Sequence, residues 1–198
     1  KIYMSTRDTL IRAYMAGAIL ALAAVFAVSA SVMSGSALVG AILFPVGFCM
    51  LYLLGFDLLT GVFVLTPLAW LDKRPGVTIN AILKNWGLVF TGNFLGALTV
   101  AFMMAFVFTY GFSTPPNDIG TKIGHIGEAR TLGYAKYGLM GWLTIFMRGM
   151  LCHWMVSTGV VGAMICTNVT GKIVTMWMPI MLFFYMGFEH SIVNMFLF

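Results

Sequence analysis

Long apolar stretches, separated by short polar segments, follow one another along nearly the whole chain. The first covers about Thr9–Val32, the second Ala37–Trp70, and the third about Ala81–Phe112. A fourth covers about Tyr137–Thr167, and a fifth runs from about Gly171 to Phe198. About 20 apolar residues in a helix are enough to cross the hydrocarbon core of a bilayer. The pattern therefore predicts five membrane-crossing helices.

Two of these stretches are interrupted. As one straight helix, Ala37–Trp70 would be about 50 Å long, against a hydrocarbon core of about 30 Å. Gly55–Asp57 and Thr60–Gly61 are the expected break points, because glycine and polar residues weaken a helix there. The fifth stretch is interrupted at Gly187–His190. The segment from Ser113 to Lys136 is expected to be a polar connection.

Composition agrees with a membrane protein. A soluble domain is about 45–50% apolar and about 25% charged, whereas this chain is 61% hydrophobic and 9% charged. Charges are too few to cover a water-facing surface, and the chain is too apolar for disorder. Strands of a membrane barrel alternate apolar and polar residues, but the apolar runs here are unbroken. The sequence therefore predicts an all-α, multi-pass membrane protein.

The net charge of +5 is interpreted as a topology signal rather than a nucleic-acid signal, because the basic residues lie mostly between apolar runs. Cytosolic loops are enriched in Lys and Arg. The side that carries the N-terminus has more of them and is predicted to be cytosolic. The residues on that side are Lys1, Arg7, Arg12, Lys73, Arg74, Lys84 and Lys172. Those on the other side are Lys122, Arg130 and Lys136.

The two interruptions form part of a faint internal repeat. Gly55-Phe56-Asp57 recurs as Gly187-Phe188-Glu189, and Arg12 has a counterpart in Arg148 at a similar distance before the motif. Each copy interrupts the second span of a three-span unit. Because three is odd, the second unit must be inverted in the membrane, an arrangement typical of transporters and channels with a site at the breaks.

The repeat predicts one transmembrane channel domain over 1–198 with an aquaporin-like inverted repeat of three helices. Repeat one covers about 1–112 and repeat two about 137–198. The second repeat is incomplete, so a sixth helix is missing from this chain. We expect the natural protein to continue past Phe198.

Several ionisable side chains fall within or close to the spans, where a charge costs about 2.5–3.5 kcal/mol. They are Asp57, Arg148, His153, Glu189 and His190. For Asp57 and Glu189 a structural role is favoured over direct transport, since a carboxylate can accept hydrogen bonds from N–H groups freed at a break. Arg148 either pairs with one of them or lies near an interface. His190 is predicted to line a pathway, because it adjoins the second break.

Four segments resemble the formate/nitrite transporter family, whose members are pentameric anion channels with six helices per subunit. They are GFDLLTG (Gly55–Gly61), KNWGLVFTGNFLGAL (Lys84–Leu98), RGMLCHWMV (Arg148–Val156) and GFEHSIVNMF (Gly187–Phe196). The resemblance covers essentially the whole chain. Within the family, the sequences of these motifs are closer to the cyanobacterial and algal plastid branch, which includes nitrite and bicarbonate carriers.

The resemblance implies roles for individual residues. His190 matches the central pore histidine, which is thought to donate a proton or a hydrogen bond to the passing anion, and Thr60 matches the threonine that bonds to it. Lys136 matches a basic residue near the non-cytosolic vestibule. Positions that form hydrophobic constrictions match Phe44, Phe48, Leu58 and Phe183. Histidine titrates near neutral pH, so proton transfer at His190 would make transport respond to pH there.

Two positions depart from the family pattern. His153 stands where relatives commonly have Asn, which adds either a second titratable group or, as we favour, a hydrogen-bonding substitute. Leu59 stands where some relatives carry Phe, so the loop gate is expected to be less bulky. Both changes bear on selectivity.

The predicted function is a channel or proton-coupled carrier for small monovalent anions: nitrite, formate or bicarbonate. The resemblance implies a homopentamer in a chloroplast inner envelope or a bacterial inner membrane. No enzyme activity, cofactor or metal is expected, because HExxH is absent and Cys49, Cys152 and Cys166 are scattered. The alternatives are a haem-binding protein, with His153 and His190 as axial ligands, and a structural membrane protein.

Overall fold

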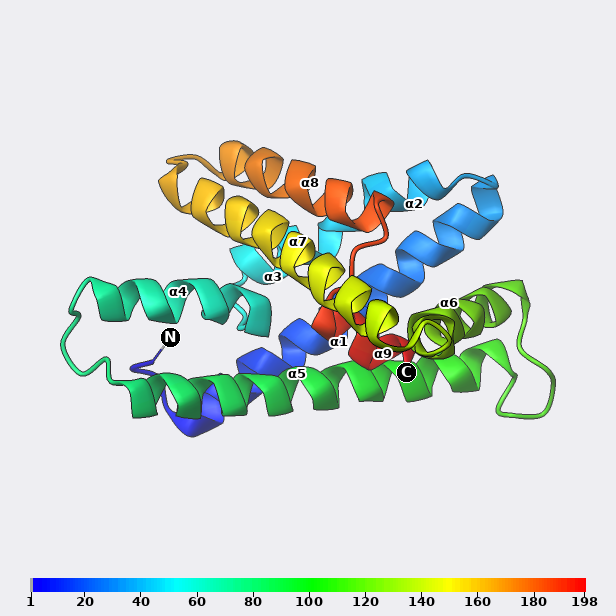
Figure 1. Ribbon diagram of the computed structural model, residues 1–198, viewed down its shortest axis with the longest axis horizontal. Coiled ribbons are helices and arrows are strands. Elements are labelled where there is room, and N and C mark those ends of the chain that lie inside the picture. The colour runs from blue at the N-terminus through cyan, green and yellow to red at the C-terminus, as the bar shows by residue number, and fades with distance from the viewer. Residues whose placement is uncertain (1) are drawn as a thin grey trace.

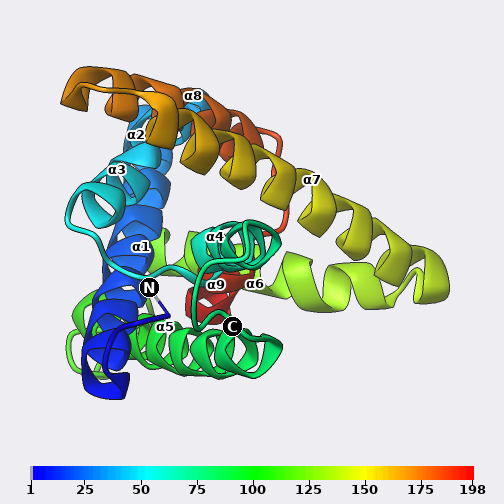
Figure 2. The ribbon, with the colours of Figure 1, turned by 90° about the vertical axis from the view of Figure 1, so that its left-hand side faces the viewer.

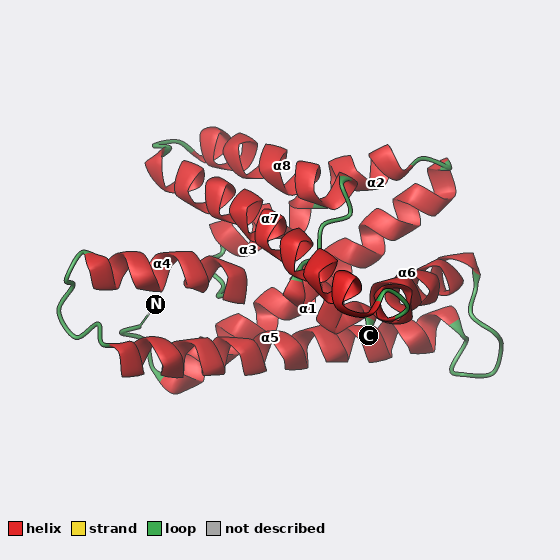
Figure 3. Ribbon diagram, in the orientation of Figure 1, coloured by secondary structure: helices red, strands yellow, loops and turns green. Residues whose placement is uncertain are grey.

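The computed structural model describes residues 2–198 and is built from helices joined by short loops (Figure 3). The described residues contain no strand. The helices are α1 (Thr6–Ser34), α2 (Ala37–Leu43), α3 (Pro45–Leu53), α4 (Leu59–Leu71), α5 (Ile79–Phe108), α6 (Asp118–Ala135), α7 (Gly138–Ile165), α8 (Val169–Tyr185) and α9 (Ser191–Leu197). The all-α prediction is confirmed.

Among the described residues, three helices, α1, α5 and α7, are long and apolar enough to cross a membrane by themselves. The shorter apolar helices are α2 with α3, α4, and α8. In Figure 1 the start of α1, the α4–α5 loop and the α7–α8 loop lie on the left, whereas the α1–α2 turn and the α5–α6 loop lie on the right. The left-hand end is the one that the charge pattern assigns to the cytosol. Lys1, one of the residues in that pattern, lies outside the described residues.

Side-chain caps and left-handed glycine set the ends of the long helices. Ser5 accepts a hydrogen bond from the backbone N–H of Asp8 at the start of α1, and Thr78 caps α5 in the same way. At the other end of α1, Gly35 has φ 67° and stops the helix before the turn. These residues fix where each apolar stretch begins and ends.

The second apolar stretch is divided differently from the prediction. Its break lies between Leu53 and Leu59, as expected for Gly55–Asp57, but Thr60–Gly61 lie inside the first turn of α4 and do not break it. An additional interruption occurs at Phe44, because Pro45 lacks an N–H group and begins a new helix. The interruption of the fifth stretch, between α8 and α9, is confirmed.

The polar connection contains a helix that the sequence prediction missed. α6 covers Asp118–Ala135, where we expected no helix. Asn117 caps its first turn by accepting a hydrogen bond from Gly120 N–H, and Asp118 lies in that turn, where a negative charge is favourable. Hydropathy alone does not reveal such a helix, since its residues are mostly polar or small.

The most extensive contact between two helices joins α1 and α5, which run past each other in Figure 2. A Cβ atom added at Gly17 would lie 2.1 Å from the carbonyl oxygen of Asn93, and one added at Gly96 would lie 2.1 Å from that of Tyr14. Glycine is therefore needed on both helices. This close approach fixes α5, which carries Asn93, against α1.

We expect Gly96→Ala to destabilise the protein by about 1–3 kcal/mol, because the added methyl group meets backbone that cannot move without separating the helices. Gly87→Ala is the matched control, since Gly87 is also on α5 and a Cβ there meets no atom within 4 Å. Thermal unfolding in detergent measures both. Equal midpoints for the two variants would contradict the tight crossing.

Candidate functional site

The first break joins α3 to α4 and is supported by α1. Gly55 has φ 73°, a left-handed conformation that L side chains rarely adopt. The Arg12 guanidinium donates a hydrogen bond to the Gly55 carbonyl at 3.1 Å. Carbonyl groups freed from a helix need partners in an apolar medium, and Arg12 supplies one.

Asn93 on α5 holds the same break from the other side. Its Oδ1 accepts a hydrogen bond from Leu59 N–H at 2.8 Å, and its Nδ2 donates to the Asp57 carbonyl at 2.9 Å. Nδ2 also donates to the Ala13 carbonyl on α1 at 2.7 Å. The side chain is fully buried. One amide therefore joins α1, the break and the start of α4.

The second break has the same form. Gly187 has φ 66°, and Arg148 Nη1 donates to its carbonyl at 3.4 Å. This contact corresponds to that between Arg12 and Gly55. His190 then caps α9, because its Nδ1 accepts a hydrogen bond from Val193 N–H at 3.3 Å.

His190 and Thr60 bring the two breaks together. The Nε2 atom of His190 lies 3.3 Å from the Thr60 hydroxyl oxygen, and only 2% of the His190 surface is exposed. A neutral imidazole has one donor and one acceptor nitrogen. Since Nδ1 accepts from Val193, the hydrogen belongs on Nε2, which donates to Thr60.

Three phenylalanine rings pack beside this pair. The ring centroids of Phe44, Phe48 and Phe183 lie 5.8–5.9 Å from one another, with edge-to-face geometry. His190 stacks on Phe183 at 5.6 Å and meets the Phe48 ring edge-on at 5.5 Å. All three rings are buried. The structure thus forms an aromatic cluster at the positions named for constrictions.

Cavities lie on both sides of the aromatic cluster. One of about 360 Å³, here called the apolar cavity, is lined by Phe48, Leu58 and residues of α3, α4, α7 and α8, and it lies toward the end that the charge pattern assigns to the cytosol. One of about 230 Å³, the outer cavity, is lined by Lys122, Arg130, Phe184 and parts of α1, α2 and α9. Phe44 stacks on Phe184 at 4.0 Å. Aromatic rings therefore separate an apolar cavity from one with two cations.

A third cavity, here called the histidine cavity, borders the His190–Thr60 pair. It measures about 310 Å³ and is lined by Thr60, Phe63, Ile145, Gly149, Cys152, His153, Glu189, His190, Ser191 and Asn194. Four residues singled out from the sequence, Thr60, His153, Glu189 and His190, thus meet at one place. The His153 ring lies edge-on to Phe63 at 6.1 Å.

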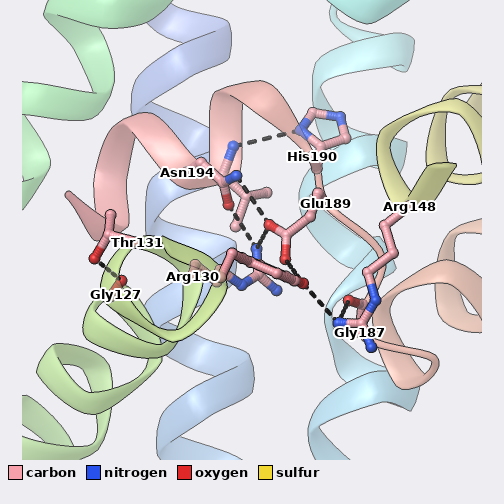
Figure 4. Close-up of polar contacts among 10 residues, drawn as sticks. Gly127, Arg130, Thr131, Arg148, Gly187, Glu189, His190 and Asn194 are labelled. Atoms are coloured by element: carbon pink, nitrogen blue, oxygen red, sulfur yellow. Dashed lines mark hydrogen bonds and ion pairs between the residues drawn. The ribbon is translucent and has the colours of Figure 1, made fainter. Parts of the chain in front are cut away.

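Glu189 is the centre of a charged network (Figure 4). Its Oε1 accepts a hydrogen bond from Tyr134 at 2.8 Å, and its Oε2 accepts one from Asn194 at 3.0 Å. Arg130 forms an ion pair with it at 3.4 Å. Arg148 donates to the Tyr134 hydroxyl at 2.7 Å, so it reaches Glu189 through Tyr134.

The remaining predicted residues are less central. Leu59 is buried and begins α4, and Asp57 is buried in the first break, where it lines the apolar cavity. Lys136 follows α6, is exposed, and lies with its Nζ 5.0 Å from the centre of the Tyr137 ring. Lys122 and Arg130, rather than Lys136, line the outer cavity.

Comparison with known proteins agrees with this arrangement. A sequence model described as formate/nitrite transporter matches residues 1–198. The chain belongs to the formate/nitrite transporter family. The resemblance carried by the four motifs is therefore confirmed, while membership of a plastid or nitrite branch stays a prediction.

Two relatives illustrate the extent of the match within the formate/nitrite transporter family. Formate channel FocA of Haemophilus influenzae is 34% identical over 189 residues, which are 92% of this chain and 62% of FocA. A probable formate transporter of Methanothermobacter thermautotrophicus is 34% identical over 160 residues, 77% of this chain and 57% of that protein. The chain spans less than two thirds of the length of either relative.

Solved structures confirm the fold. A pentameric formate channel with formate bound superposes with a TM-score of 0.73 at 21% identity, covering 96% of this chain and 72% of the other. A channel described as an FNT family ion channel gives a TM-score of 0.79 at 22% identity, with the same coverage. The all-helical arrangement is thus that of formate/nitrite transporter channels.

Sequence analysis missed four residues that hold the breaks. Asn93, Arg130, Tyr134 and Asn194 received no role in the site. The spacing of Arg130 and Tyr134, four residues apart, is a usable signal, since it places both on one face of α6 once that helix is recognised. A polar residue within an apolar stretch, as at Asn93, is a second signal.

We expect Asn93→Leu to destabilise the protein by at least about 2 kcal/mol, because it leaves buried N–H and C=O groups at the break without their partner. Thermal unfolding in detergent measures the loss. Asn85→Leu is the control: Asn85 is also buried on α5, but its Oδ1 has no hydrogen-bond partner among the described residues. If the two substitutions cost the same, Asn93 does not hold the break.

Proposed function

We propose that this protein conducts small monovalent anions across a membrane, with the His190–Thr60 pair as the central contact for the anion. The observation that carries the proposal is that two helix breaks meet at this pair, beside an aromatic cluster with cavities on both sides. Buried polar groups at helix breaks in the membrane are typical of transport sites. The matched relatives are named transporters and channels.

The charges along the proposed pathway favour an anion. Lys122 and Arg130 line the outer cavity, and long-range attraction by such cations raises the local anion concentration. The aromatic cluster then excludes water and larger solutes. An anion is costly to desolvate among phenylalanine rings, so polar groups are needed there. Thr60 and His190 are the polar side chains that lie beside the aromatic cluster.

Geometry supports hydrogen bonding rather than proton transfer as the role of His190. Its Nδ1 accepts from Val193 N–H, and its Nε2 donates to the Thr60 oxygen. The Thr60 hydroxyl hydrogen is then free to be donated to an anion. Protonating His190 a second time would break the cap of α9, which makes the ring a poor proton carrier.

The remaining features of the proposal come from the resemblance and the repeat. We propose a homopentamer with one pore per subunit, built on an inverted repeat of about 1–112 and about 137–198. The corresponding contacts Arg12–Gly55 and Arg148–Gly187 support the repeat.

His153, which lines the histidine cavity, is proposed as a hydrogen-bonding substitute for the Asn of relatives. Nitrite, formate and bicarbonate are the candidate anions, in a bacterial inner membrane or plastid envelope.

The haem-binding alternative is less well supported. Both ring nitrogens of His190 are already engaged, with Val193 and Thr60. Axial ligation of iron by His190 would therefore remove either the helix cap or the contact between the two breaks. Visible absorption of the purified protein distinguishes this alternative.

Reconstituted into liposomes, the full-length protein should carry formate, nitrite or bicarbonate at rates well above those of empty liposomes. Flux of the three anions is compared side by side at two pH values. Preference for one anion identifies the substrate, and equal flux of all three indicates selection by size and charge alone. Absence of flux for every anion contradicts the proposed function.

His190→Val should lower anion flux by up to about tenfold, because it removes the hydrogen bond that orients the Thr60 hydroxyl toward the anion, and a neutral hydrogen bond contributes about 0.5–1.5 kcal/mol. His190→Asn should keep most of the flux and the same pH profile, since its amide can both cap α9 and donate toward Thr60. Both variants are measured in liposomes across neutral pH. Should Asn prove as inactive as Val, or lose the pH response, His190 acts as a proton donor instead.

A further inference from the structure

Two histidines line the histidine cavity, and they differ in what surrounds their ring nitrogens. In His190 both nitrogens are engaged: Nδ1 accepts from Val193 N–H, and Nε2 lies 3.3 Å from the Thr60 hydroxyl oxygen. The ring nitrogens of His153, on α7, have no hydrogen-bond partner among the described residues. Protonating His153 therefore breaks no contact, whereas protonating His190 removes the cap of α9. We propose that His153 is the residue that takes up a proton as an anion enters the histidine cavity.

Proton uptake is added to the hydrogen bonding that the neutral His153 ring can provide, and it rests on the proposed anion conduction. A neutral imidazole can replace an amide as a hydrogen-bonding group, but only the imidazole can become a cation near neutral pH. The proton comes from water, and the imidazolium then has an N–H donor on both nitrogens. A positive charge is thereby created where the anion passes.

Aromatic contacts orient the His153 ring at the cavity wall. The ring meets the Phe63 ring edge-on at 6.1 Å, and Phe63 in turn meets the Trp86 ring at 4.6 Å. Trp86 Nε1 donates to the Thr66 hydroxyl oxygen at 2.9 Å, which links this aromatic row to α4 and α5. His153 is only half-buried, and the cavity of about 310 Å³ has room for an anion of a few atoms. The ring is thus held in place by its faces and edges, while its nitrogens stay available.

The titratable and charged groups around this cavity leave the anion as the partner of a protonated His153. They are Cys152 and Arg148 on α7, Glu189 and His190 at the second break, and Arg130 and Tyr134 on α6, which reach the cavity through Glu189. From α4 come Thr60 and Phe63, which are uncharged, and in the described part of the chain α5 and α8 add no residue to the lining. The Glu189 carboxylate is already paired with Arg130 at 3.4 Å.

Proton and anion are expected to bind His153 together. Partial burial opposes a charged imidazole, because the ring loses part of its hydration. A passing anion a few ångström away offsets that cost by Coulomb attraction. Each ligand then favours the other by the same factor, as linkage requires. The proton is released again when the anion leaves the cavity.

The first test follows the histidine rings directly by NMR, in full-length protein with isotope-labelled histidine. Spectra are recorded between about pH 5 and pH 8, with and without formate or nitrite. His125→Gln, His153→Asn and His190→Asn assign the signals. His125 is exposed on α6, 3.7 Å from Glu128, and serves as the reference for an ordinary histidine.

We expect the His153 signal to titrate in the presence of an anion that is carried, and the His190 signal to stay unchanged. Formate or nitrite should move the midpoint of the His153 titration to higher pH by about one unit, which corresponds to a tenfold coupling between proton and anion. A His153 signal that does not titrate with either anion overturns the assignment, as does a His190 signal that titrates in its place.

The second test measures flux of formate and nitrite into liposomes, with equal pH on both sides and the rates of empty liposomes subtracted. In the wild type the half-saturating concentration should fall by about tenfold from pH 8 to pH 5, as an added positive charge near the anion can produce. His153→Asn should abolish this fall, because an amide does not titrate, and His125→Gln should keep it. If His153→Asn does not assemble, His153→Gln carries the same comparison.

Flux whose pH dependence survives in His153→Asn overturns the assignment while leaving anion conduction intact. Lack of flux by the wild type for formate, nitrite and bicarbonate contradicts the proposed function itself, so the two failures are distinguishable.

Discussion

Backbone groups released where a helix breaks inside an apolar medium must find partners, and the rest of this structure follows from that requirement. No water in the hydrocarbon region satisfies a free N–H or C=O group, and each one left unpaired costs several kcal/mol. The chain breaks two of its apolar stretches, at Gly55 and Gly187. Both breaks are then surrounded by side chains from other helices that supply the missing hydrogen bonds.

These partners also explain why the site lies where it does. Asn93 can reach the first break only because α1 and α5 approach so closely at Gly17 and Gly96. The second break is reached from α6 and α7 by charged and phenolic side chains. Once both breaks are fixed, Thr60 and His190 are left facing each other, with phenylalanine rings packed beside them. The proposed contact for the anion thus lies where the backbone itself is least self-sufficient.

Hydropathy, a repeated Gly-Phe-acid motif and four family motifs were enough to predict the spans, both breaks and the pairing of Thr60 with His190. They did not predict α6, because a helix of small and polar residues has no hydropathy signal. Without α6 there was no reason to bring Arg130 and Tyr134 toward Glu189. The interruption at Pro45 was overlooked, since the search for break points concentrated on glycine and charge. Asn93 was not predicted to hold the first break, because its small and apolar neighbours indicate only close helix packing.

The two breaks are held by different chemistry. Besides an arginine at each glycine carbonyl, a neutral amide enclosed between long apolar helices holds the first break, whereas ionisable and phenolic groups on α6 contribute to holding the second. Natural sequence variation in the segment between α5 and α7 is therefore expected to adjust one half of the proposed pathway while the other half stays constant. Among homologues, differences in selectivity or conductance are expected to accumulate in that connecting segment rather than in the helices that cross the membrane.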